Sequence, residues 1–187
     1  MNLPRPFVFS LPGEWIQLAS IRDVNLLSTG DSHVSPARQR RLKREVSAMQ
    51  AWASDTAAAS VWLQVVDGGA VAIAELALRP ASAPSAAALV ESLALSQPVG
   101  YRRQLVSTRS INVAPGVSVA YGREIIAGPT PPHRLVACFS AWLFDDSTPG
   151  EVWNMRVSTP HLDREEQIAE AGLASLARLA ETYLGVS

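Results

Sequence analysis

The segment Gly116-Val-Ser118-Val-Ala120 superficially resembles the nucleophile elbow of hydrolases. In that motif the serine occupies a sharp turn between a strand and a helix. Here Ser118 follows the turn signal Pro115-Gly116 and lies within a run of β-favouring residues. The sequence therefore predicts an ordinary strand serine and no catalytic residue at this position.

The residue types that bind metal ions are present but scattered. The histidines are His33, His133 and His161. None has a partner at the short spacing typical of metal ligands. Asp145, Asp146 and Glu151 could attract a cation, but acidic residues around a Pro-Gly turn are usually solvated. We therefore expect no metal site and no cofactor.

Cys138 is the only cysteine, which excludes an intrachain disulfide. It lies in the most apolar stretch of the chain, where a buried thiol behaves as a small hydrophobic group. The sequence favours a packing role over a reactive one.

Arg40, Lys43 and Arg44 form the one candidate binding site. Ser35-Pro36 is a typical helix start, and an apolar stripe through Leu42 predicts a helix to residue 54. The three basic residues share a face away from this stripe, near the helix N-terminus, where the macrodipole disfavours positive charge. They indicate a docking surface for an acidic or phosphate-bearing partner; the alternative is a solvated helix face. The net charge of −1 gives no support to nucleic-acid binding.

The bulk composition fits a single globular domain over residues 1–187. The 48% hydrophobic and 18% charged content is ordinary for a globular protein and excludes disorder as the main state. We find no signal peptide and no apolar run long enough to span a bilayer, so a cytoplasmic protein is expected. The abundance of alanine and of arginine over lysine suggests a high-GC, bacterial genome.

Turn signals divide the chain into hairpins and helices. Strand pairs are predicted at 6–10 with 15–18, 58–66 with 70–79, 104–114 with 117–126, and 134–144 with the strand that begins at 151. Helices are predicted at 36–54, 84–96 and 163–184, the last with Asp163 as its N-cap and Gly172 in its apolar stripe. The Pro-rich segment 127–133 is predicted as a loop.

The strand 134–144 is apolar at nearly every position, which is typical of a strand covered on both faces. The sequence therefore predicts an α+β fold: a mainly antiparallel sheet with helices on both faces and a long C-terminal helix. Symmetric counting from the 145–150 turn places Phe144 opposite Glu151 and Trp142 opposite Trp153.

The opening F-V-F-S-L-P-G-E-W and the closing V-W-N-M-R-V-S-T-P-H-L-D-R-E-E-Q resemble the ends of PsbP-like α/β/α sandwich proteins. The order of elements resembles that superfamily along the whole chain. The resemblance implies a mostly non-enzymatic protein with no shared catalytic motif. Many bacterial relatives are exported or lipidated, whereas this sequence carries neither signal near its start.

Two hypotheses of function follow. The first is a non-catalytic accessory or adaptor protein that binds another protein. The second is a small-ligand-binding protein or enzyme with a START-like helix-grip cavity between the sheet and a helix. A cavity requires polar groups that point into an apolar pocket. The doubly apolar strand 134–144 favours the closed sandwich and the first hypothesis.

Overall fold

The structure is a computed structural model, and it describes residues 15–18, 36, 37, 40, 44, 60–66, 69–95, 102–127 and 135–184. The predicted strand at 6–10, most of the predicted helix at 36–54 and residues 128–133 of the Pro-rich loop lie outside these ranges.

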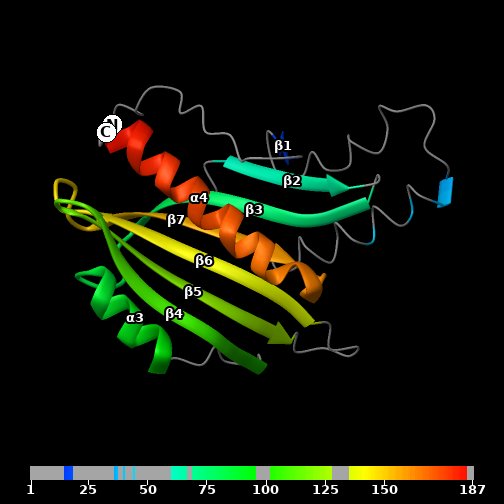
Figure 1. Cartoon of the computed structure of the whole chain (residues 1–187), viewed down its shortest axis with the longest axis horizontal. Helices are drawn as coiled ribbons and strands as arrows, with labels where there is room; N and C mark the ends of the chain where they lie inside the picture. Colours follow the sequence, from blue (N-terminus) through cyan, green and yellow to red (C-terminus); the bar gives the residue numbers. More distant parts are fainter. Residues whose placement is uncertain are drawn as a thin grey trace.

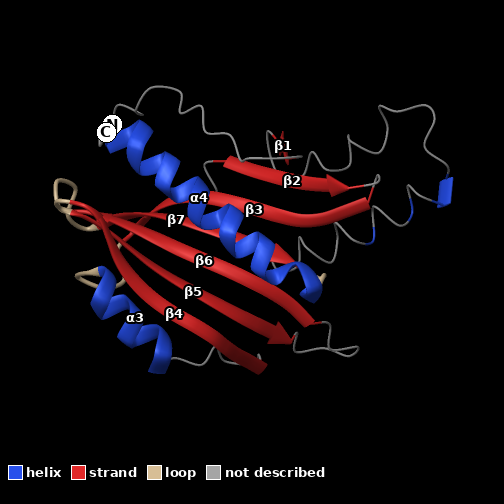
Figure 2. Ribbon diagram, viewed as in Figure 1, coloured by secondary structure: helices blue, strands red, loops and turns tan. Residues whose placement is uncertain are grey.

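The fold is built on one seven-stranded antiparallel sheet (Figures 1 and 2). The strands are β1 (Trp15–Leu18), β2 (Ser60–Val66), β3 (Gly69–Pro80), β4 (Arg102–Ala114), β5 (Val117–Ala127), β6 (Leu135–Asp145) and β7 (Glu151–Thr159). Their order in the sheet is β1-β2-β3-β7-β6-β5-β4, so β6 is an interior strand and β4 lies at one end. The predicted α+β class, with its mainly antiparallel sheet and long C-terminal helix, is confirmed.

Two tight turns set the register of two hairpins. Val66 pairs with Gly69 and Ala114 with Val117, so each turn contains two residues. Gly116 has φ of 74°, a left-handed conformation that glycine adopts without steric penalty. Both hairpins, which the sequence predicts from Asp-Gly and Pro-Gly signals, are confirmed.

The predicted pairing of Trp142 with Trp153 is wrong. Trp142 pairs with Asn154 and Leu143 with Trp153, so the two tryptophans point to opposite faces of the sheet. Asp145 remains in β6, where it pairs with Val117 of β5, and its carboxylate accepts hydrogen bonds from the backbone and hydroxyl of Ser147. The connection is therefore five residues long, 146–150, and this one-residue difference exchanges the faces.

The C-terminal helix α4 (Glu165–Leu184) begins later than expected. Asp163 lies inside a short 3₁₀ turn, η2 (Leu162–Arg164), so its predicted role as N-cap is wrong. Glu165 in the first turn of α4 instead forms a two-pronged ion pair with Arg123 of β5. This pair joins the start of the helix to the sheet, and a carboxylate there also complements the helix dipole.

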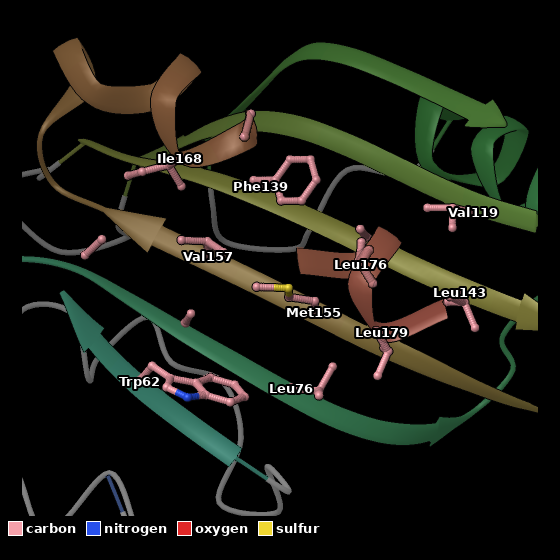
Figure 3. Packing of buried hydrophobic residues seen from close by; sticks show 14 of the residues in the cluster. Trp62, Leu76, Val119, Phe139, Leu143, Met155, Val157, Ile168, Leu176 and Leu179 are labelled. Atoms are coloured by element: carbon pink, nitrogen blue, oxygen red, sulfur yellow. The ribbon is translucent and has the colours of Figure 1, made fainter. Parts of the chain in front are cut away.

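The main core lies between α4 and the sheet (Figure 3). Its buried members include Trp62, Leu76, Val119, Phe139, Leu143, Met155, Val157, Ile168, Leu176 and Leu179. A Cβ atom on Gly172 would lie 2.4 Å from Cε1 of Phe139, far inside contact distance. Glycine at this position therefore lets the helix backbone rest directly on the aromatic ring of β6.

A second cluster surrounds helix α3 (Ala86–Leu95), which the sequence predicts at 84–96. Ala86 and Leu89 of α3 pack with Phe144 of β6, whereas α4 packs with Phe139 and Leu143. Successive side chains of a strand point to opposite faces, so the two helices contact opposite sets of β6 side chains. This arrangement accounts for the loss of alternation in the sequence of β6. None of the helices described is long and apolar enough to cross a membrane.

We predict that Gly172→Ala lowers the free energy of unfolding by about 1–3 kcal/mol, although alanine is the better helix former. The added methyl group must displace the Phe139 ring. Denaturant unfolding would measure the loss. Combining the change with Phe139→Leu should reduce the additional cost of the alanine, and an equal cost in both backgrounds would contradict this contact.

Candidate functional site

The basic residues of the candidate binding site are only partly described. Arg40 and Arg44 are helical and exposed, and Lys43 lies outside the described residues. Arg40 Nε donates a hydrogen bond to Pro36 O (3.2 Å), and Arg44 Nε donates one to Arg40 O (3.4 Å). These bonds hold both guanidinium groups against their own helix. Their role as a binding surface stays a prediction.

The other candidate residues from the sequence are not brought together into one site by the described part of the structure. Ser118 lies inside β5, opposite Phe144, as predicted for a strand serine. His161 is half-buried beside η2, while His33 and His133 lie outside the described residues. Within the described ranges no group of three or more histidine, cysteine or acidic side chains could hold a metal ion.

The acidic turn after β6 borders an open pocket of about 660 Å³. Asp145, Asp146 and Glu151 line it together with residues 81–85 that precede α3. The Asp145 carboxylate is already bonded to Ser147, and the Ser85 hydroxyl accepts the backbone N–H of Ala88 at the start of α3. These two polar groups of the pocket therefore serve a local turn and the start of a helix.

A cluster of polar side chains lies on the sheet face opposite α4, where sequence reasoning missed it. Cys138 Sγ is 3.5 Å from Ser158 Oγ and 3.5 Å from Arg156 Nη2. In the strand register Glu75 is directly opposite Arg156, and Glu124 is directly opposite Cys138. Four strands, β3, β7, β6 and β5, thus contribute to one polar cluster in the middle of the sheet.

The cluster places a positive charge between two carboxylates. Burial by itself lowers the pKa of Arg156, but the neighbouring Cys138, Glu124 and Glu75 together raise it above its ordinary value. Arg156 therefore stays charged throughout the physiological range. Glu75 is only 6% exposed, so its carboxylate depends on polar neighbours within the sheet.

We interpret this polar cluster as a structural ion network and not as an active site. The Cys138 thiol is 1% exposed, as is Ser158, so neither is open to a substrate. The sequence correctly placed the thiol in the interior, yet its neighbours are polar. The only hint of the polar cluster within the sequence is that polar residues are spaced two apart, and so share a face, in two strands: Cys138 with Ser140, and Arg156 with Ser158. The pairing across strands could not be read from the sequence.

Strand β4 offers the longest exposed edge among the described elements. It has 13 residues and pairs only with β5 in the described part of the sheet. Residues 109–113 are all exposed. Three apolar side chains of β4 are also well exposed, with exposed fractions of 45% for Val106, 42% for Ile111 and 37% for Val113. Edge strands carry backbone groups that can pair with another chain.

Two irregularities divide this edge. The pairing of β4 with β5 shifts between Leu105 and Ser107 and again between Asn112 and Ala114, so Val106 and Val113 are the extra residues. Between these bulges the six residues Ser107–Asn112 pair regularly. Six residues is a typical strand length, so this stretch can accept one further strand of ordinary size.

No protein-family model matches the chain, and no curated protein is significantly similar to it.

We predict that Arg156→Ala lowers the free energy of unfolding by about 3 kcal/mol, since it leaves Glu75 buried without the charge opposite it. The matched control is Arg123→Ala. The Arg123–Glu165 side chains are 25% and 16% exposed and remain partly hydrated, so removing Arg123 should cost less, about 1–2 kcal/mol. Chemical denaturation of both variants tests the difference, and similar losses would contradict the interpretation of the polar cluster.

Proposed function

We propose that this chain is a non-catalytic accessory or adaptor protein that binds another protein through the free edge of β4. The single observation that carries the proposal is the exposed edge at 109–113, which overlaps the six-residue stretch of regular strand at Ser107–Asn112. Strand addition at such an edge supplies affinity through main-chain hydrogen bonds and specificity through alternate side chains.

The packing of α4 supports this function over a START-like helix-grip cavity. A cavity between sheet and helix would separate the two, whereas Gly172 rests on the Phe139 ring. Ile168, Leu176 and Leu179 fill the same interface and are at most 4% exposed. A small ligand has no room at this contact.

The predicted resemblance to PsbP-like proteins supports the same function, because that superfamily is mostly non-enzymatic. Its α/β/α architecture is compatible with the two helices, which pack on opposite sets of β6 side chains. We keep membership of that superfamily, a bacterial source and a cytoplasmic location as parts of the proposal.

The edge is tested by two apolar-to-lysine changes made together, Ile111→Lys and Val113→Lys. Charged side chains on edge strands prevent pairing with further strands. Affinity capture from the native cell, with a photo-crosslinking residue at exposed Ser110, should recover a partner with the unaltered edge and lose it with the double variant. Leu135→Lys is the control, because Leu135 is 46% exposed on interior strand β6.

A crosslinked partner that persists in the edge variant, or is lost equally in the control, would contradict the proposal. Both variants should unfold at nearly the same denaturant concentration as the parent, since exposed substitutions usually change stability by about 0.5 kcal/mol or less.

The basic face of Arg40, Lys43 and Arg44 is the second candidate surface, and reversing all three to glutamate tests it. If an acidic partner docks there, its capture should be abolished and should also weaken with salt in the parent protein. Stability should change little, because Arg40 and Arg44 are exposed. An unchanged set of captured proteins would leave this face as a solvated helix surface.

A further inference from the structure

We infer that the segment added beside β4 is an extended, acidic stretch of a partner protein, and that it pairs with Ser107–Asn112. This inference rests on the proposed function and names the chemistry of its partner. It follows from the charge of the strand, the faces of its exposed side chains and the positions of its bulges.

The charge of β4 is strongly one-sided. Its 13 residues, RRQLVSTRSINVA, include Arg102, Arg103 and Arg109 and no acidic residue. Helix α3, which lies against β4, adds one acidic residue, Glu91. The chain as a whole carries a net charge of −1, so this positive edge is a local feature. Complementary charge favours an acidic segment and rejects a basic one.

The faces of the strand define a short recognition pattern. Arg109 pairs with Tyr121 and Ile111 with Val119, so both lie on the face that carries α4. Ser110 and Asn112 lie on the other face, opposite Ala120 and Ser118. An added strand would thus place a carboxylate next to Arg109 and an apolar side chain next to Ile111, two residues apart on one face.

A second copy of this chain fits the edge poorly. Antiparallel pairing of two β4 strands with Arg109 opposite Arg109 would set these two positive charges side by side, and like charges across an interface disfavour association. The bulges at Val106 and Val113 also limit regular pairing to six residues. The edge is therefore suited to one short foreign segment and protected against continued sheet growth.

The test uses three fluorescent peptides of about ten residues with the repeat X-Thr-Val-Thr, in which X is glutamate, lysine or threonine, so that X and valine lie two residues apart on one face. Each is titrated into the full chain and followed by anisotropy. The glutamate peptide should bind at least tenfold more tightly than the lysine peptide, and added salt should reduce this preference. Ile111→Lys should weaken all binding, and the control Leu135→Lys should not.

Arg109→Glu separates charge recognition from strand pairing. It should weaken the glutamate peptide about tenfold and shift the preference toward the lysine peptide. Arg178→Glu, an exposed position on α4 with the same change of net charge, should leave the affinity within about twofold.

Three results would overturn the inference. Equal binding of all three peptides, abolished by Ile111→Lys, would mean that the edge takes strands without regard to charge; the proposed function would stand. A dimer of the parent chain that Ile111→Lys dissociates in sedimentation would make a second copy the occupant. If none of the peptides binds, the role that remains for the arginines is to prevent β4 from pairing with a further strand.

Discussion

The contact between the backbone of Gly172 and the ring of Phe139 fixes the position of α4 on the sheet. A side chain on residue 172 would collide with the ring at 2.4 Å, so only glycine permits this approach. Ile168 on one side and Leu176 on the other then bury their side chains over β6 and β7. The Arg123–Glu165 ion pair holds the start of the helix, and together these contacts close the sheet-to-helix interface.

The opposite set of β6 side chains has a different character along its length. Near the 146–150 turn these side chains are apolar and pack with α3. In the middle of the sheet, Cys138 of the same set belongs to the polar cluster around Arg156. Ion networks inside a protein contribute little net stability compared with apolar packing, but removing one member is costly. We therefore regard the polar cluster as a constraint on how β3, β7, β6 and β5 pair, with the binding function located elsewhere.

Much of this fold could be predicted from the sequence, because its main signals are local. The two-residue turns, the stripe of α4 and the doubly apolar β6 depend on residues close together in the chain. The predicted pairing of Trp142 with Trp153 failed because Asp145 stays in β6, paired with Val117 of β5, and the turn is one residue shorter than the sequence indicates. The N-cap at Asp163 failed because a 3₁₀ turn precedes the helix.

The candidate sites were harder to predict, because they depend on strand order. The sequence contains Cys138 and Arg156, but only the pairing of β6 with β7 brings them together. Likewise, nothing in the segment RRQLVSTRSINVA shows that it ends the sheet. A strand of the same composition in the interior would have no free backbone groups to offer.

Amide hydrogen exchange along β4 tests the central claim most directly. In the free chain, amides of Ser107–Asn112 that point away from β5 should exchange rapidly, while those of interior β6 are protected. Addition of the acidic valine–glutamate peptide should slow exchange at Ser107–Asn112 and leave β6 unchanged. Outward β4 amides that are already protected in the free chain, or protection that appears elsewhere when the peptide binds, would contradict the account.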